Sequence, residues 1–577
     1  MVYGLERGAH ARIDQRITII SVVILLFFLA VVWRLFWLQV LAHEQYATAA
    51  LIQHFRQAEV SATRGQIFAR DHTNSQSEDL YPLVANKILY EVYINPTEIT
   101  RPQNTAEALA SALGLDVADI LPRVEKEGDI YEPIKKRVTD QELALVKKID
   151  LPGIYSREEY WRFYPDKEVG SHILGYYGAS DKGNQGFYGL EGYWDDVLSG
   201  SNAEQTVAES GSGAIITGAS ELSQAIDGAD LLLTLDRTIQ YEACRALDRS
   251  AVELGANGGS VIIMETQTGR ILAMCNTPGF DPNQYQQVET ISNFNNNAVF
   301  EAYEPGSVLK AITMAVAIDD RKVEPTTSYE DSGTVKLAGF EIKNSDRKAH
   351  GVQTMTQVLE NSLNTGMIFA TQNVTNETFR DYISNFGFGK KFDLDLDQES
   401  AGDISSLSKH GLIHKATASF GQGLTVTPLQ MLAASNVLAS GGKLYKPYIV
   451  EEIRYADGRV DKRQPEVIRN VIRPETAAKV TSMMVSVVEN GFGKRAGVPG
   501  YYVAGKTGTA QVAEGGSYGG KTIQTFIGFA PANKPKFTML TKLNNPSGAG
   551  WAESSAAPLF GELAEFLLHY YQIPPER

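Results

Sequence analysis

Residues 304–310 read Glu-Pro-Gly-Ser-Val-Leu-Lys, and they open the most informative stretch of this sequence. Apolar residues follow at helical spacing as far as Ile318, whereas Pro305 and Gly306 interrupt any helix before them. The pattern therefore predicts a helix that carries Ser307 in its first turn. Because residues three positions apart share a helix face, we expect the Lys310 amine to reach the Ser307 hydroxyl.

A serine next to a lysine can be the nucleophile of a covalent enzyme. A serine hydroxyl reacts poorly unless a neighbouring base takes its proton. A lysine can act as that base only if its pKa falls from about 10.4 to about 7 or 8, a shift that costs about 4 kcal/mol. Burial and a second nearby cation are the usual causes of such a shift. The pair thus predicts another cation in the same site.

The Ser-x-x-Lys spacing by itself is weak evidence, because it also occurs from Ser345, Ser406 and Ser440. Those three serines lie in polar segments or in a turn. Only Ser307 opens an apolar helix, so it is the predicted nucleophile.

Two further motifs follow in order along the chain. Residues 362–364 read Ser-Leu-Asn, and residues 505–509 read Gly-Lys-Thr-Gly-Thr directly after the strand-like run 501–503. Ser-x-x-Lys, Ser-x-Asn and Lys-Thr-Gly in this order resemble the motif set of the penicillin-binding proteins and serine β-lactamases. The resemblance implies a serine acyl-enzyme built on an antiparallel sheet flanked by helices.

Length and composition exclude other classes. The 577 residues, 43% hydrophobic and 21% charged, are typical of roughly two to four globular domains. A net charge of -15 argues against a nucleic-acid partner. The sequence has no His-Glu-x-x-His motif, so no metal or other cofactor is expected. For Cys244 and Cys275 two buried free thiols are favoured, and one structural disulfide stays open.

The N-terminal region predicts a membrane anchor. Residues 1–16 form a short tail with three arginines, and residues 17–40 are apolar over a length that can cross a bilayer. The basic tail predicts a cytoplasmic N-terminus and a single pass through the plasma membrane, with the rest of the chain outside. The alternative is a signal peptide cleaved near residues 47–49, but the apolar segment is too long for one.

Residues 41–225 show no obvious chemistry, yet short islands there resemble the stem, or pedestal, of class B penicillin-binding proteins. The islands are Arg64-Gly65-Gln66-Ile67, Pro82-Leu83, Arg162-Phe163-Tyr164-Pro165 and Gly189-Leu190-Glu191. Arg64 and Glu191 are expected to hold the stem together by charge pairing. The resemblance implies a pedestal or dimerisation-type domain without a catalytic role of its own.

Residues 226–577 resemble the transpeptidase, or penicillin-binding, domain. Alternating and helical patterns predict strands at 231–235, 260–266, 270–276, 525–530 and 536–543, and helices at 237–253 and 558–571. The predicted fold class is α/β of the α+β kind. It comprises one transmembrane helix, an elongated mixed stem and a domain of serine β-lactamase-like fold.

The resemblance implies a peptidoglycan D,D-transpeptidase that crosslinks stem peptides ending in D-Ala-D-Ala. Ser307 would be the nucleophile and Lys310 the base for acylation. Ser362 would relay a proton to the leaving amine, and Asn364 would contact both the substrate and Lys310. Lys506 would supply the second cation.

The Lys-Thr-Gly motif would bind the substrate. Thr507 and Thr509 would hold the terminal carboxylate, and Gly508 would let the substrate strand lie close. The backbone N–H groups of Ser307 and Thr509 would form the oxyanion hole.

The resemblance also implies partners and leaves alternatives. β-Lactams are expected as covalent inhibitors, and a polytopic glycan polymerase of the shape, elongation, division and sporulation type as the membrane partner. Overall length and residues 281–285 favour a septal role over elongation. A β-lactamase or β-lactam sensor would lack so long a stem, and a bifunctional enzyme would show polymerase motifs. A mainly structural scaffold for the polymerase stays open, as do the acceptor residue, β-lactam susceptibility and oligomeric state.

Overall fold

The computed structural model describes residues 6–43, 55–60, 62–70, 80–181, 183–209, 215–216, 225–514 and 517–577. The alternative cleavage site at residues 47–49 lies outside these ranges. The chain divides into two compact units, one of Met1–Ala62 with Gly200–Asp227 and the other of Thr63–Ser199 with Gly228–Arg577.

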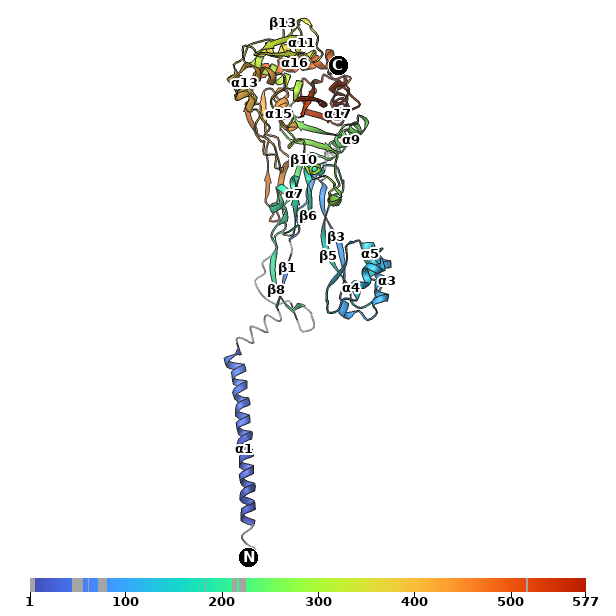
Figure 1. Cartoon of the computed structure of the whole chain (residues 1–577), viewed down its shortest axis with the longest axis vertical. Helices are drawn as coiled ribbons and strands as arrows, with labels where there is room; N and C mark the ends of the chain where they lie inside the picture. Colours follow the sequence, from blue (N-terminus) through green and yellow to red (C-terminus); the bar gives the residue numbers. More distant parts are fainter. Residues whose placement is uncertain are drawn as a thin grey trace. The chain divides into compact units, whose positions relative to one another are not determined.

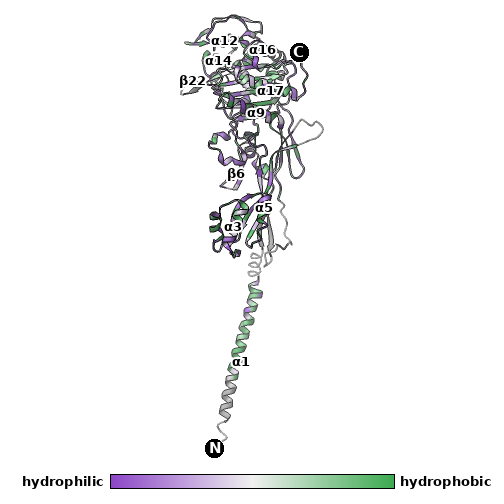
Figure 2. Ribbon diagram, turned by 90° about the vertical axis from the view of Figure 1, so that its right-hand side faces the viewer, coloured by the Kyte–Doolittle hydropathy of each residue, from purple (hydrophilic) through white to green (hydrophobic). Residues whose placement is uncertain are grey.

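The first unit contains the N-terminal helix. Helix α1 (Glu6–Phe36) continues into one π-helical turn, η1 (Trp37–Leu41). The segment Ile17–Leu41 is apolar (Figure 2) and long enough to cross a membrane. Most of its side chains are exposed. The same unit holds a three-stranded antiparallel sheet of β1 (Phe55–Val60), β8 (Ala203–Glu209) and β9 (Ile215–Ile216).

The second unit begins with the stem. Its sheet is built from β2 (Ile67–Arg70), β3 (Leu80–Ile94), β4 (Glu132–Val138) and β5 (Ile154–Phe163), together with β10 (Asp230–Asp236), β18 (Val450–Arg454) and β19 (Val460–Lys462). One end of β3 and β4 forms a small core with α3 (Pro102–Leu113), α4 (Val117–Val124) and α5 (Asp140–Val146) (Figure 1). Shorter elements follow: α6 (Ser171–Leu174), β6 (Tyr176–Ser180), β7 (Gly183–Phe187), α7 (Gly189–Tyr193) and α8 (Asp195–Ser199).

A buried ion-pair group ties the stem elements together. The Arg64 Nη2 and Glu191 Oε2 atoms lie 2.6 Å apart, and the Arg162 Nε atom lies 2.6 Å from Glu191 Oε1. Burial of Glu191 disfavours its charge, but the two guanidinium groups outweigh burial and hold the pKa of this carboxyl below its usual range. The predicted pairing of Arg64 with Glu191 is confirmed.

The catalytic part of the second unit is organised around a five-stranded antiparallel sheet in the order β12-β11-β23-β22-β21. The strands are β11 (Gly258–Glu265), β12 (Ile271–Thr277), β21 (Ala504–Glu514), β22 (Ser517–Ala530) and β23 (Phe537–Asn544). Helices α9 (Arg237–Glu253) and α17 (Ala556–Tyr570) pack together on one face, and α10 (Lys310–Asp319) and α15 (Pro428–Ala439) share the core on the other (Figure 1).

The continuous apolar run of β11 explains this two-sided packing. On β11, Val261 and Ile263 belong to the core under α9 and α17, whereas Ile262 and Met264 belong to the core under α10 and α15. Successive side chains of a strand point to opposite faces, so a continuous apolar strand buries both faces of the sheet.

Further helices and hairpins surround this sheet. The helices are α11 (Met355–Glu360), α12 (Asn364–Thr371), α13 (Asn376–Asn385), α14 (Leu412–Ala418) and α16 (Pro474–Asn490). The hairpin-like pairs are β13 (Ser328–Asp331) with β16 (Gly351–Thr354), β14 (Thr334–Leu337) with β15 (Phe340–Lys343), and β17 (Lys443–Tyr445) with β20 (Val467–Asn470).

The predicted strands and helices of the catalytic part are found, with two differences. The strand predicted at 231–235 is β10, but it pairs with β2 and β18 in the stem sheet. The prediction of a strand at 501–503 is wrong, because β21 begins at Ala504 and contains the Lys-Thr-Gly motif. Tyr501 instead packs in the core beneath α17, and its hydroxyl donates to the Ile573 carbonyl at 2.6 Å.

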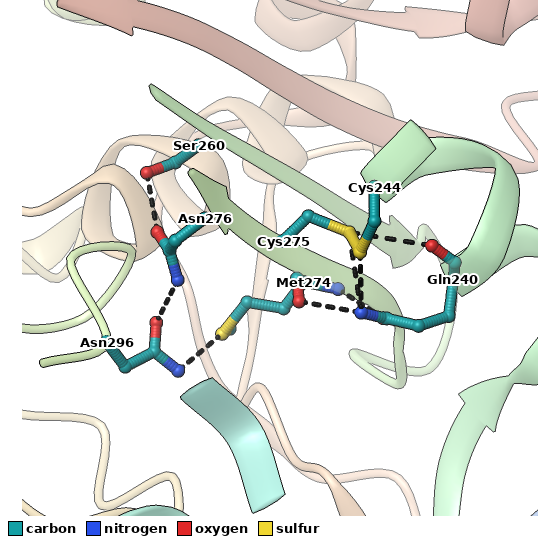
Figure 3. Close-up of a disulfide and its surroundings, with 7 residues drawn as sticks. All are labelled: Gln240, Cys244, Ser260, Met274, Cys275, Asn276 and Asn296. Carbon is teal, nitrogen blue, oxygen red and sulfur yellow. Dashed lines mark hydrogen bonds between the residues drawn. A yellow bond between two sulfur atoms is a disulfide. The ribbon is translucent and has the colours of Figure 1, made fainter. Parts of the chain in front are cut away.

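Cys244 and Cys275 form a disulfide between α9 and β12 (Figure 3). The favoured interpretation of two free thiols is therefore wrong, and the bridge that the sequence left open is present. Beside it, the Gln240 side chain donates to the Met274 carbonyl and accepts from the Met274 N–H, each at 2.9 Å. This packing of α9 on β12 brings the two sulfur atoms together.

Candidate active site

Ser307 lies in a tight turn at the start of the predicted helix. The turn is the 3-10 segment η5 (Gly306–Leu309), and α10 follows it directly. The helix is therefore confirmed, with a first turn that is wound more tightly than an α-helix.

Glycines hold this turn in place. Gly306 has a positive φ of 56°, and its N–H donates to the Gly421 carbonyl at 3.0 Å. A Cβ atom on Gly421 would lie 2.1 Å from the Gly306 oxygen, so a side chain there would displace the turn. A Cβ atom on Gly508 would lie 2.9 Å from Val308 Cγ1. Gly508 thus lets strand β21 approach the serine turn as well.

The two predicted lysines converge on Ser362. The Lys310 Nζ atom donates to the Ser362 carbonyl at 2.6 Å and contacts its hydroxyl at 3.2 Å. The Lys506 Nζ atom lies 3.1 Å from the same hydroxyl and 3.0 Å from the Thr507 carbonyl. Among the described residues, Lys310 makes its side-chain hydrogen bonds to Ser362, and the predicted bond to the Ser307 hydroxyl is not formed in this state.

The electrostatics of the site match what the chemistry requires. Both lysine side chains are fully buried. Burial and the nearby Lys506 charge hold the pKa of Lys310 well below its usual range. Burial lowers the pKa of Lys506 to about 7. Lys506 is therefore placed as the second cation that the Ser307 and Lys310 pair required.

The Ser-Leu-Asn motif spans the junction of α11 and α12. Ser362 has a φ of 52°, a left-handed conformation that is uncommon for serine. Asn364 is the first residue of α12, and its side-chain amide donates to the Lys343 carbonyl at 2.9 Å. In the described part of the chain, the predicted contact of Asn364 with Lys310 is therefore not formed.

A cavity of about 240 Å³ opens onto these groups. Its walls include Ser307, Ser362, Thr507 and Thr509, all of them predicted site residues. The Thr509 hydroxyl accepts a hydrogen bond of 3.1 Å from the Ala552 N–H. The loop before α17 thus forms one side of the cavity.

Sequence reasoning missed several residues of this cavity. They are Ser345, Asp346, Asn361, Phe492, Trp551, Ala552 and Glu553. Trp551 is 56% exposed and Phe492 43% exposed, so two large apolar side chains at the cavity are open to solvent. The position of Trp551 in a loop rich in glycine and serine was the available sequence signal.

Two buried lysines meet at Ser362, which shares a cavity with the Ser307 turn beside an edge strand. This arrangement defines the class of this protein as a serine acyl-transferring enzyme. Comparison with known families agrees. The family described as penicillin binding protein transpeptidase domain matches residues 259–565, and the penicillin-binding protein dimerisation domain matches residues 59–233.

Full-length relatives show the same similarity. The chain is 32% identical to Stage V sporulation protein D of Bacillus subtilis, over 99% of this chain and 88% of that protein. It is 30% identical to peptidoglycan D,D-transpeptidase FtsI of Escherichia coli, over 98% and 94%. Penicillin binding protein 3 of Mycobacterium tuberculosis, solved with aztreonam, superimposes with a TM-score of 0.69 at 26% identity, over 90% and 98%.

The chain belongs to the class B penicillin-binding proteins, and its enzyme class is serine peptidoglycan transpeptidase. The predictions of family, fold class and enzyme class are confirmed. The single apolar N-terminal helix is consistent with a single-pass membrane anchor.

Proposed function

We propose that this chain crosslinks peptidoglycan during septum formation, with Ser307 as the nucleophile. The observation that supports the proposal is the Ser362 hydroxyl, which lies within 3.2 Å of the amines of both Lys310 and Lys506. Ser362 lines the same cavity as Ser307 and so connects the nucleophile turn to the two buried amines.

In the first half-reaction the Ser307 oxygen attacks the carbonyl between the two terminal D-alanines of a donor stem peptide. Lys310 takes the hydroxyl proton, because burial and Lys506 favour its neutral form. The bond between the carbonyl carbon and the amide nitrogen then breaks. Ser362 passes its proton to that nitrogen and regains one from the Lys310 ammonium, 3.2 Å away. D-alanine then leaves, Lys310 is neutral again and an ester on Ser307 remains.

In the second half-reaction an amine of a neighbouring stem peptide attacks this ester. A new C–N bond forms, the bond to the Ser307 oxygen breaks, and the serine regains a proton. The sequence of steps is a ping-pong acyl transfer.

Substrate binding is assigned to the β21 edge of the five-stranded sheet. Strand β21 is the last strand in the sheet order, so a peptide strand can pair along it. Thr507 and Thr509 line the cavity and would hold the terminal carboxylate. The N–H groups of Ser307 and Thr509 would stabilise the oxyanion by about 3 to 4 kcal/mol per donor.

We also propose that the Asn364 side chain contacts the substrate. Its amide is bonded to Lys343 in this state, so the side chain would leave that carbonyl when a stem peptide enters.

The proposed organisation keeps the predicted borders. Residues 1–16 are the cytoplasmic tail, 17–40 the anchor, 41–225 the stem and 226–577 the catalytic domain, which lies outside the membrane. A polytopic glycan polymerase is the proposed membrane partner, and β-lactams are the proposed covalent inhibitors.

A second candidate is a sporulation-specific transpeptidase, which the similarity to Stage V sporulation protein D supports. Depletion of the protein from growing cells distinguishes the roles. A septal enzyme leaves filaments, an elongation enzyme leaves round cells, and a sporulation enzyme leaves growth unchanged.

The catalytic proposal is tested with the full-length chain in detergent and a fluorescent penicillin. We expect a stable adduct that peptide mass mapping places on Ser307. Rapid loss of the adduct by hydrolysis would favour a β-lactamase, and growth rescue by a Ser307→Ala variant would favour a scaffold. Folded wild-type protein that takes no label would refute the proposed chemistry.

A further inference from the structure

Lys542 is a fully buried cation that the proposed mechanism does not use. It lies on β23, the central strand of the sheet, close to the buried apolar residues Leu540 and Leu543. Its Nζ atom donates to Glu301 Oε2 at 2.7 Å and lies 5.1 Å from the centre of the Tyr303 ring. Well-packed apolar residues often stabilise a protein at least as well as a buried ion pair, so stability alone does not explain this lysine.

The register of the sheet places Lys542 in the middle of a row of small and polar residues. Lys542 pairs with Thr525 on β22, which pairs with Gly508 on β21. On its other side Lys542 pairs with Ser260 on β11, which pairs with Asn276 on β12. Because directly opposed residues share a face, these five residues form one row across all five strands. We call this the polar row.

The segment 296–308, which contains Ser307, contacts the polar row at three points. These are a hydrogen bond of 2.8 Å from Asn276 to Asn296, the ion pair of Lys542 with Glu301, and the close approach of Gly508 to Val308. Figure 3 shows the first of these contacts, with Ser260 bonded to Asn276 and Asn276 to Asn296. The segment therefore crosses the sheet over the row and ends at the nucleophile.

The loop 421–426 holds the same segment from another side. Tyr303 exchanges two backbone hydrogen bonds of 2.9 Å with Val426. The Glu304 carboxylate accepts from the Gly423 N–H at 2.7 Å, and Gly306 bonds to Gly421. The segment is thus clamped between a loop and the polar row.

The two partners of the Lys542 and Glu301 ion pair differ in burial. The Lys542 side chain is 0% exposed, whereas that of Glu301 is 36% exposed and can also reach water. A buried ammonium left without its partner costs several kcal/mol, so Lys542 strongly favours the position of Glu301 seen here.

We propose that Lys542 is a positioning residue for the nucleophile, which holds Glu301 and thereby sets the course of segment 296–308 and the place of Ser307. The inference rests on the proposed function, since it concerns the acylation of Ser307. It assigns no contact of Lys542 with the substrate. A misplacement of about 1 Å at the reacting atoms can cost up to about a hundredfold in rate.

The test measures acylation of the full-length chain in detergent by a fluorescent penicillin, at several drug concentrations. This separates the acylation rate constant from the Kd of the complex before covalent reaction. Lys542→Met keeps the length of the side chain without its charge, and Glu301→Gln keeps its shape. We expect each variant to lower the rate constant about tenfold and to leave the Kd within about twofold.

Two further measurements separate positioning from general stability. The double variant should be no slower than the slower single variant, because both changes break one interaction. The pH at half-maximal rate should stay unchanged, because Lys310 and Lys506 remain in place.

A matched control is available beside the same strand. Lys536 Nζ lies 2.9 Å from Glu265 Oε1 just before β23, away from segment 296–308. Lys536→Met should acylate at the wild-type rate. The acylation rate constant of Lys536→Met could fall as much as that of Lys542→Met, with both losses in proportion to the loss in Tm. The role of Lys542 would then be merely structural and the proposal wrong.

The remaining outcomes are equally decisive. Folded Lys542→Met and Glu301→Gln with wild-type rate constants would overturn the proposal while leaving the proposed function intact. If Lys542→Met fails to fold, Glu301→Gln decides alone, because its side chain is partly exposed. Wild-type protein without label would instead overturn the proposed function, and this inference with it.

Discussion

The stem and the active site both bury charged side chains, but they combine them in opposite ways. In the stem, Glu191 is enclosed by two arginines, and opposite charges hold its pKa low. In the active site two lysines lie within 3.2 Å of one serine hydroxyl, and burial together with the like charge of Lys506 holds the pKa of Lys310 low. The first arrangement keeps its groups ionised and stabilises the fold. The second destabilises an ammonium and so creates a base.

The largest effect is expected from the nucleophile. Ser307→Ala should abolish covalent labelling by fluorescent penicillin while Tm stays within about 2 °C of wild type, since a small partly exposed hydroxyl is lost. Gel fluorescence and thermal unfolding measure the two quantities. A labelled alanine variant would show that another residue forms the adduct.

Removal of the like charge should come next. Lys506→Met should slow acylation near pH 7 by about a thousandfold. Without the neighbouring cation the pKa of Lys310 rises, so the neutral base forms only at higher pH. The rising limb of the pH-rate profile therefore moves to higher pH. Lys506→Arg keeps the charge and is the control for the position of that limb. An unmoved limb in Lys506→Met would show that burial alone tunes Lys310.

The opposite-charge group in the stem should respond in stability rather than in rate. Arg64→Met leaves Glu191 with one arginine, and breaking a buried pair costs about 3 to 5 kcal/mol. Chemical denaturation of the full-length chain measures this loss. The partly exposed pair of Arg245 with Glu242 offers a control, because Arg245→Met should change stability by less than about 1 kcal/mol. A slower acylation rate in folded Arg64→Met would show that the stem ion pairs also affect catalysis, which contradicts this distinction between stem and active site.

The smallest effect is expected from pH. The folded-state pKa of Glu191 lies below its ordinary value of 4.5, so its ion pairs stabilise the fold fully above that pH. This contribution is lost as the pH falls through the folded-state pKa. Tm measured from about pH 6 down to about pH 3 should therefore fall more steeply in wild type than in Glu191→Gln. Parallel curves would mean that other carboxylates dominate acid unfolding.

Local patterns were sufficient for much of the catalytic part. The apolar spacing after Lys310 predicted the helix, and the apolar runs 260–266 and 270–276 predicted the strands β11 and β12. The three short motifs contain the residues Ser307, Ser362, Thr507 and Thr509, which line one cavity. Such patterns report backbone conformation and the face that each residue buries, which are properties of neighbouring residues.

Contacts between distant residues needed the folded chain. The run 501–503 has the composition of a strand, but it lies outside β21, and Tyr501 and Val503 pack in the core under α17. Asn364 belongs to a motif, yet its amide is bonded to Lys343. Neither outcome can be read from local pattern, because each depends on which segments meet in space.

The sequence alone thus determined the family and the enzyme class and predicted the residues of the site, since motifs and periodicity are written in adjacent positions. The tertiary structure decided that Ser362 lies between the two lysines, that Cys244 bonds to Cys275 and that Lys542 holds Glu301. These pairings arise from helix packing and strand register, which join residues from 31 to 241 positions apart. Local propensity carries no information about such pairings.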